Sequence, residues 1–247
     1  MTTQPGRWLL REPSEHSGAR LFCIPYSGCG ASMYRSWPRF TGDLEICPVQ
    51  LPGRESRMRD QPAETYQELA AALIDGLLPY LDRPFAFFGH CAAALPGYEA
   101  ALQLAARGYP VPARVFVSSQ VAPHQGPHGR FLEMTDAQLR ATLSELIAVA
   151  GGKPVPSLID LSLEILLADI ELNKRYRLDV PVALACPITA LGWRQDAEVD
   201  PELMAGWAEC GQTTFRLLDG QHYSFMDGSP ELMDMFLLDL RLPAARS

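Results

Sequence analysis

The stretch FAFFGHCAAALPGYEAALQLA, residues 85–105, decides the fold that we expect for this chain. Its first part is a short, continuous apolar run, which is typical of a strand buried on both faces. A helix rich in small residues follows and is expected to end at Gly108. Between them lies Gly89-His90-Cys91-Ala92-Ala93, where small residues two places before and after Cys91 allow a sharp turn. Such a turn presents the side chain at its apex, here a thiol, at the carboxyl end of the strand.

The rest of the chain repeats this alternation of apolar strands and amphipathic helices. A further helix is predicted at 65–81, and further strands are predicted at 19–28, 44–54, 113–120, 181–193 and 213–220. The alternation predicts an α/β fold with a mostly parallel central sheet flanked by helices on both faces. Ligands of such sheets bind at the carboxyl ends of the strands, so we expect the chemistry of this protein there.

One segment breaks the alternation, because residues 124–176 contain two helix patterns with no strand between them. The patterns are TDAQLRATLSELIAVAGG, residues 135–152, and SLIDLSLEILLADIELNKRYR, residues 157–177. The first has a capping sequence at its start and Gly151-Gly152 as a stop. An extra pair of core helices would explain this pattern. We favour a helical lid, because the insertion falls between strands, at the edge where a site of this kind would lie.

Composition and charge exclude several classes of protein. The 247 residues fit a single domain over 1–247, with 47% hydrophobic and 20% charged residues. A net charge of -8 argues against a nucleic-acid or anionic-membrane surface. No apolar run reaches the roughly 20 residues of a membrane span, and the N-terminal residues do not resemble a signal peptide. The six cysteines contain no CxxC pair, so we expect buried, reduced thiols in a cytoplasmic protein without a metal site.

Two further residues stand where they suit catalysis together with Cys91. Asp196 and His222 each follow a predicted strand. Taken singly, a thiol in a turn is more often buried structure, a loop histidine belongs to the surface, and a loop acid caps a helix. The order nucleophile, acid, histidine, with each residue after a strand, is that of the α/β-hydrolase triad. Cys91 is then the nucleophile, His222 the base and acid, and Asp196 its orienting partner, while His90 packs beside the turn.

Backbone N–H groups for an oxyanion hole are expected from two places. The residue after the nucleophile, Ala92, supplies one, and the glycine-rich loop IPYSGCGAS, residues 24–32, supplies the other from Ser27. A plain strand-to-helix turn is the alternative for this loop. Cys29 lies in the same loop, and a disulfide to Cys91 is conceivable, although reduced thiols are the expectation.

Motifs along nearly the whole chain occur in a combination that one enzyme family shares. They are VQLPGRE at 49–55, the elbow at 89–94, LIAVAGGKP at 146–154, LLADIELNKRYR at 166–177, Asp196 with Val199, Pro201 and Glu202, and GQHY at 220–223, besides the glycine-rich loop. The chain therefore resembles the stand-alone type II thioesterases of polyketide and nonribosomal peptide biosynthesis. The departure from that family's G-H-S-M-G-A elbow is Cys91 in place of serine, followed by Ala92-Ala93 in place of Met-Gly.

This resemblance implies an α/β-hydrolase fold with a mobile helical lid. It also implies an acyl substrate carried as a phosphopantetheine thioester, with no separate cofactor. The implied partner is an acyl or peptidyl carrier protein or a carrier domain of a synthase, and neither nucleic acid nor membrane. The usual role of the family is hydrolytic editing of such acyl groups.

The cysteine leaves three hypotheses open. The family match favours hydrolysis of the carrier-bound thioester. The second hypothesis is acyl or aminoacyl transfer from Cys91 to another carrier thiol or an amine, because exchange between two thioesters is nearly balanced. An inactive carrier-binding module is the third and least favoured, because Asp196 and His222 remain and a cysteine–histidine pair is competent.

Overall fold

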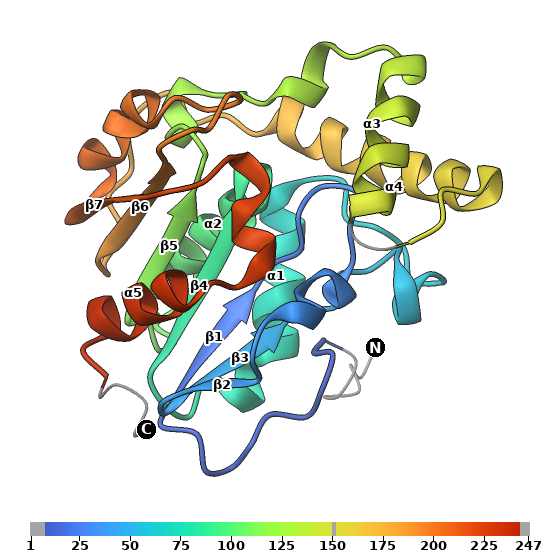
Figure 1. Cartoon of the computed structure of the whole chain (residues 1–247). Coiled ribbons are helices and arrows are strands. Elements are labelled where there is room, and N and C mark those ends of the chain that lie inside the picture. The colour runs from blue at the N-terminus through green and yellow to red at the C-terminus, as the bar shows by residue number, and fades with distance from the viewer. Residues whose placement is uncertain (1–7, 150–151, 243–247) are drawn as a thin grey trace.

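A seven-stranded sheet in the order β2-β3-β1-β4-β5-β6-β7 forms the centre of the computed structural model, which describes residues 8–149 and 152–242 (Figure 1). All neighbouring strands are parallel except β2 and β3. The strands are β1 (Ala19–Cys23), β2 (Phe40–Thr41), β3 (Leu44–Pro48), β4 (Phe85–His90), β5 (Arg114–Ser118), β6 (Ile188–Trp193) and β7 (Thr213–Leu218). The predicted mostly parallel sheet is confirmed.

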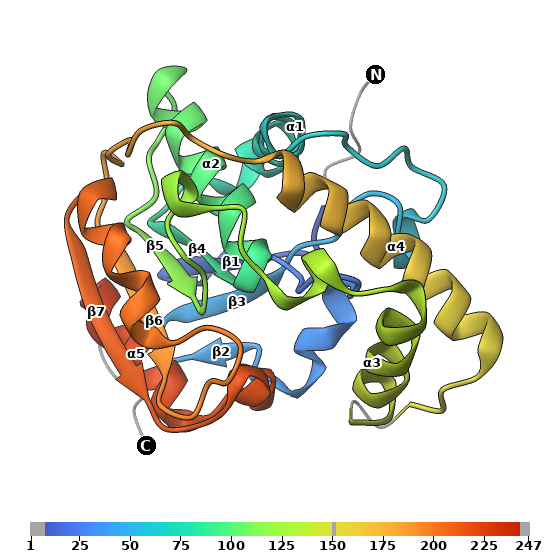
Figure 2. The same ribbon diagram turned by 90° about the horizontal axis from the view of Figure 1, so that it is seen from above.

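Helices cover both faces of the sheet, as the two perpendicular views show (Figures 1 and 2). Helices α1 (Tyr66–Leu77) and α2 (Ala94–Ala106) lie on one face, and α5 (Pro230–Leu240) lies on the other. Every residue of β4 is buried, because this strand has a parallel neighbour on each side and an apolar layer above and below. Its continuous apolar run therefore correctly predicted a strand buried on both faces.

The strand predicted at 181–193 is wrong in its first half, because β6 begins only at Ile188. Residues 181–187 form an irregular segment in which Leu184 donates its backbone N–H to Cys210 and Val182 accepts a hydrogen bond from the Tyr98 hydroxyl. Pro181 and Pro187 lack the N–H that a central strand needs. Apolar character alone did not separate this segment from a strand.

The insertion contains two long helices, α3 (Asp136–Val149) and α4 (Pro156–Arg175). The Thr135 hydroxyl accepts a hydrogen bond from the N–H of Gln138, as the capping pattern predicted. Gly151 lies outside the described residues, whereas the N–H of Gly152 donates to the carbonyl of Ile147. In both views the pair lies beside the β1–β3 half of the sheet, away from β6 and β7, and near the carboxyl ends of the strands (Figures 1 and 2).

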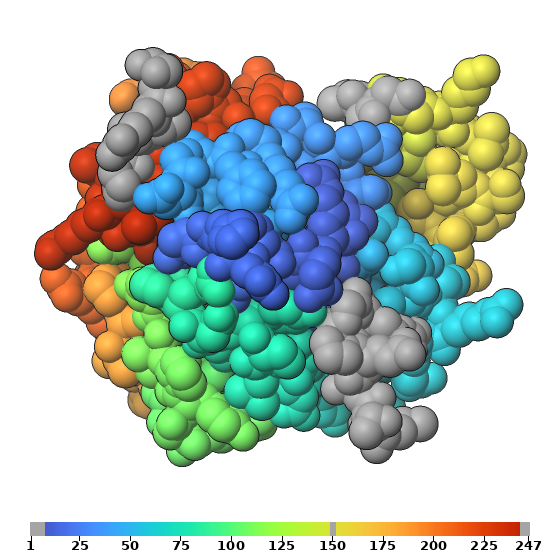
Figure 3. Space-filling view, turned by 90° about the horizontal axis from the view of Figure 1, so that it is seen from below, coloured from blue at the N-terminus to red at the C-terminus, as the bar shows by residue number. Residues whose placement is uncertain are grey.

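At the opposite end of the molecule, other parts of the chain cover the sheet. Seen from below, the blue chain around β1 and β2 lies across the centre of this end, and the yellow start of α4 projects at its edge (Figure 3). The amino ends of the parallel strands point this way, so the loops that bear predicted site residues lie at the other end (Figure 1). No helix among the described residues is long and apolar enough to cross a membrane.

Candidate active site

The turn after β4 has the geometry of a nucleophile elbow. Cys91 has a φ of +54°, a left-handed backbone that residues with a side chain rarely adopt, and it begins a short 3₁₀ turn that leads into α2. A Cβ on Gly89 would lie 2.1 Å from the backbone oxygen of Ala93, so only glycine lets strand and helix approach this closely. His90 is buried beside the turn, with Nδ1 2.8 Å from Ser118 Oγ and its ring stacked on Phe225.

The loops after β6 and β7 bring Asp196 and His222 together. His222 Nδ1 lies 3.1 Å and 3.0 Å from the two carboxylate oxygens of Asp196. Asp196 Oδ2 also accepts a hydrogen bond of 2.7 Å from Ser119 Oγ, and Oδ1 accepts the backbone N–H groups of Glu198 and Val199. Burial favours the neutral carboxyl, but these hydrogen bonds, led by those from His222 and Ser119, hold the pKa of Asp196 well below its usual range. The carboxylate is therefore charged and fixed in one orientation.

The imidazole of His222 is almost fully buried and interacts with Cys91 and Glu198 besides Asp196. Burial lowers its pKa, but the hydrogen bond to Asp196, the interaction with Cys91 and the charge of Glu198 together raise the pKa of His222 to about 9. Nε2 has no hydrogen-bond partner among the described residues. Oε2 of Glu198 lies 3.3 Å from it, at the distance of an ion pair with a protonated imidazole. Glu198 is in turn paired at 2.7 Å with Arg130, in the segment that leads into α3. The site therefore stabilises an imidazolium next to the thiol.

A small hollow adjoins the thiol on the side of the α3–α4 pair. It has about 10 Å³ of free volume and is lined by Ser27, Cys91, Ala92, Gly129, Phe131, Leu132, Asp169, Ile170 and Asn173. Both residues that the sequence suggested for the oxyanion hole, Ser27 and Ala92, are thus next to Cys91. The Cys91 side chain is buried, and all six cysteines are free thiols, so Cys29 and Cys91 form no disulfide.

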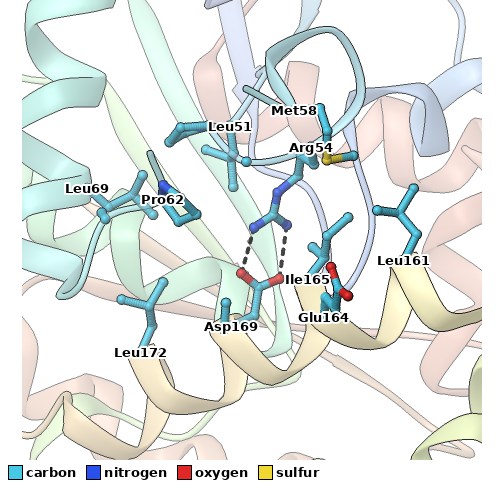
Figure 4. Close-up of a pocket in the computed structure, with 14 residues that line it drawn as sticks. Leu51, Arg54, Met58, Pro62, Leu69, Leu161, Glu164, Ile165, Asp169 and Leu172 are labelled. Atoms are coloured by element: carbon cyan, nitrogen blue, oxygen red, sulfur yellow. Dashed lines mark hydrogen bonds and ion pairs between the residues drawn. The ribbon is translucent and has the colours of Figure 1, made fainter. Parts of the chain in front are cut away.

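A buried ion pair ties α4 to the glycine-rich loop. The guanidinium of Arg54 binds the carboxylate of Asp169 through two hydrogen bonds, of 2.9 Å and 2.7 Å (Figure 4). It also donates to the backbone carbonyl of Cys29. Asp169 in addition accepts the backbone N–H of Gly28 at 2.8 Å, directly after Ser27. The pair thus fixes the conformation of the loop that carries Ser27 and links it to α4.

The same ion pair separates the small hollow from a larger one. The larger hollow has a volume of about 210 Å³ and lies between α4 and the loop after β3. Its walls are mainly apolar, with Leu51, Pro62 and Leu172 on one side and Met58 and Leu161 on the other (Figure 4). Asp169 lines both hollows, so it stands between this apolar space and the thiol.

Sequence reasoning missed several residues that support the site. Arg54 and Asp169 lie inside quoted motifs, but nothing in the sequence pairs residues that are 115 positions apart. Ser119 comes directly after β5, which is the one available signal for a residue at the carboxyl edge. Asn173 lies at helical spacing from the apolar residues Leu166 and Ile170, so a polar residue on the apolar face of a helix was the available signal. Among the described residues, no group of three His, Cys, Asp or Glu side chains is arranged to hold a metal ion.

Comparison with known proteins assigns the chain to a family. The model of the family described as "Thioesterase domain" matches residues 19–238. The chain belongs to this family. It is accordingly a thioester hydrolase, and its sheet, elbow and helical insertion form an α/β-hydrolase fold.

Relatives of similar length come from natural-product biosynthesis. The gramicidin S biosynthesis protein GrsT of Aneurinibacillus migulanus is 29% identical, and the match covers 98% of this chain and 97% of that protein. The thioesterase RedJ of the prodiginine pathway in Streptomyces coelicolor is 32% identical, with a TM-score of 0.79 over 93% of this chain and 90% of that one. The type II thioesterase BorB of the borrelidin cluster is 26% identical, with a TM-score of 0.80 over 97% of this chain and all of that one.

Proposed function

We propose that this protein is a type II thioesterase that releases acyl groups carried as phosphopantetheine thioesters on carrier proteins of polyketide or nonribosomal peptide biosynthesis. Cys91 is the nucleophile, His222 the proton carrier and Asp196 its orienting partner. The observation that carries this proposal is the conjunction of a left-handed Cys91 in a glycine-dependent elbow with an imidazole bonded to a buried carboxylate. The biosynthetic role of the relatives supports the substrate class.

In the first half-reaction the sulfur of Cys91 attacks the thioester carbonyl. The Cys91 proton passes to His222 Nε2, and the buried Asp196 carboxylate stabilises the imidazolium that results. The carbonyl oxygen becomes negatively charged and is stabilised by the backbone N–H groups of Ala92 and Ser27. Collapse of the tetrahedral intermediate breaks the bond to the pantetheine sulfur, which takes the proton from His222. The products are an acyl-Cys91 thioester and the free carrier thiol.

In the second half-reaction water attacks acyl-Cys91. His222 Nε2 accepts the proton of the water, and the same N–H groups stabilise the second tetrahedral intermediate. Collapse breaks the C–S bond, the proton returns from His222 to the sulfur of Cys91, and the carboxylic acid leaves. The phosphopantetheine arm belongs to the substrate, so the chain needs no cofactor for these steps.

The α3–α4 pair acts in this proposal as a lid. Cys91 is buried, and the hollow beside it has about 10 Å³, which is room for about one water molecule. A pantetheine arm therefore reaches the thiol only when the pair moves away from the sheet. The carrier protein is the expected partner on this side of the molecule.

Acyl transfer is the second candidate, and the sulfur of Cys91 is the observation that favours it. Acyl-Cys91 is itself a thioester, so a second carrier thiol can take the acyl group in a nearly balanced exchange. An inactive carrier-binding module is the third candidate. The buried Asp196–His222 pair argues against it, because a module that only binds a carrier protein does not need such a pair.

The test uses the purified protein and a carrier protein loaded with an acyl group. Release of free acid is followed together with transfer to a second, differently tagged carrier, and Cys91→Ala is the control. We expect free acid from the unaltered protein and none from the variant. Transfer that outpaces release would establish the second candidate. Absence of both products with every acyl group tested would contradict catalysis and leave the binding module.

A further inference from the structure

Asn173 lies on the buried face of α4, and only one of the two polar atoms of its side-chain amide has a hydrogen-bond partner among the described residues. Its Nδ2 donates to the backbone carbonyl of His128 at 3.0 Å, whereas its Oδ1 is buried and has no hydrogen-bond partner among the described residues. The orientation is fixed, because a flipped amide would set Oδ1 against the carbonyl oxygen of His128. Asn173 is only 4% exposed, so Oδ1 is a desolvated acceptor that gains from a donor brought by a ligand.

Asn173 lines the same small hollow as Cys91, Ser27 and Ala92. Gly129 marks the space between the amide and the thiol. A Cβ built on Gly129 would lie 3.5 Å from Asn173 Nδ2 and 4.0 Å from Cys91 Sγ. The amide of Asn173 and the sulfur of Cys91 therefore border the same small space, into which the first carbons of an acyl group on Cys91 would extend.

The hollow is on the acyl side of the nucleophile. His222 must protonate the departing pantetheine sulfur, so the arm lies toward His222 during the first half-reaction. The residues that line the hollow include Ser27 and Ala92 but not His222. The acyl group, on the other side of the carbonyl carbon, then extends toward Gly129 and Asn173. Asp169 also faces the hollow, but its carboxylate is paired with Arg54.

We propose that Asn173 Oδ1 accepts a hydrogen bond from a donor on the α-carbon of the acyl group, so that the enzyme prefers small α-amino or α-hydroxy acyl thioesters over plain fatty acyl ones. The inference rests on the proposed function, since it needs an acyl group at Cys91. Asn173 is in this reading a specificity-determining residue. The shared chemistry is an N–H or O–H donor at the α-carbon. The carboxylate of Asp169, which also lines the hollow, is neutralised by Arg54, so the hollow does not require a positive charge on the donor.

The test compares three pantetheine thioesters that differ only at the α-carbon, namely alanyl, lactyl and propionyl pantetheine. The variant Asn173→Leu has a similar volume and no acceptor. Glu171→Leu, two residues away on the exposed side of α4, is the matched control. In the unaltered protein we expect kcat/KM to be higher for alanyl or lactyl than for propionyl. Loss of one hydrogen bond should lower that ratio about tenfold in Asn173→Leu and leave it unchanged in Glu171→Leu.

A second variant separates the hydrogen bond from general damage to the lid. Asn173→Asp keeps an acceptor and loses the donor to His128, so it should retain the preference for alanyl while Asn173→Leu loses it. The alanyl and lactyl substrates distinguish an amine donor from a hydroxyl donor, because a preference for only one of them identifies the donor. Equal losses for all three substrates would overturn the assignment, since they would indicate a bound water or an amide of the pantetheine arm. Turnover of none of the three by the unaltered protein would instead overturn the proposed function, and this assignment with it.

Discussion

Two places in this molecule bring a cysteine, a histidine and an acid together. In one, Cys91 and Asp196 flank His222, and in the other Cys210 Sγ lies 3.8 Å from His124 Nδ1 while His124 Nε2 lies 3.4 Å from Glu209. The residue types are nearly the same. The difference lies in what surrounds them.

The first cluster has what a reaction needs and the second does not. Cys91 stands on a strained elbow at a helix start, beside a hollow and next to the glycine-rich loop. Cys210 is fully buried at the end of a 3₁₀ helix, and burial raises the pKa of its thiol. Neither of the two hollows described above is lined by Cys210 or His124. Position at the carboxyl edge of the sheet, and not composition, thus marks the candidate site.

The largest contrast is expected from the two histidines. His222→Ala should lower kcat/KM for an acyl pantetheine about a thousandfold, because it removes general acid and base catalysis. His124→Ala should change it less than about twofold, as expected for a residue outside the reaction. Circular dichroism checks that both variants are folded. Comparable losses in the two variants would remove the distinction between the clusters.

The next contrast concerns two glycines, Gly89 two residues before Cys91 and Gly206 four residues before Cys210. Gly89→Ala should destabilise the protein by about 3 kcal/mol, because the new methyl group meets the backbone oxygen of Ala93 at 2.1 Å. Gly206→Ala should cost less than about 1 kcal/mol, because its methyl group meets only the movable end of the Gln125 side chain, at 2.2 Å. Urea unfolding measures both free energies. A mild effect at Gly89 would show that the elbow does not depend on glycine.

The third prediction concerns charge. Asp196→Asn should lower the pKa of His222 from about 9 toward its ordinary value, because the carboxylate holds the proton on the imidazole. Glu209→Gln should leave the titration of His222 unchanged. NMR titration of the imidazole follows both. Because the folded pKa exceeds the ordinary value of 6.5, the stability contributed by the imidazolium is complete below about pH 6.5 and is lost as pH rises through about 9.

The smallest effect is expected at Ser119. Ser119→Ala removes the 2.7 Å hydrogen bond to Asp196 while the backbone N–H groups of Glu198 and Val199 remain. Loss of one such bond corresponds to about fivefold in kcat/KM, or about 1 kcal/mol. Steady-state kinetics measure it. A thousandfold loss would mean that Ser119 has a direct part in the reaction.

The sequence predicted the parts of the site that depend on local patterns. The elbow could be read from the small residues around Cys91, and the strands before Asp196 and His222 from short apolar runs. The order of the three residues along the chain then indicated that they meet at one edge of a parallel sheet. The parallel topology places the three residues at one edge of the sheet, so the sequence sufficed for this prediction.

The remaining features depend on contacts that no local pattern encodes. The pairing of Arg54 with Asp169 joins a loop to a helix 115 residues later, and the unsatisfied oxygen of Asn173 follows from how α4 packs on Gly129. The segment 181–187 looked like a strand because it is apolar, but hydrogen bonds to Tyr98 and Cys210 hold it in an irregular path. Packing between distant elements decided each case.

The central claim is that Cys91, and not another thiol, accepts the acyl group. The most direct measurement is intact-mass analysis of the protein after brief exposure to an acyl pantetheine thioester, followed by peptide mapping of the adduct. We expect one acyl group, on Cys91, which is absent in Cys91→Ala and present in Cys210→Ala. An adduct on Cys210 or Cys29, or turnover that persists in Cys91→Ala, would contradict the claim.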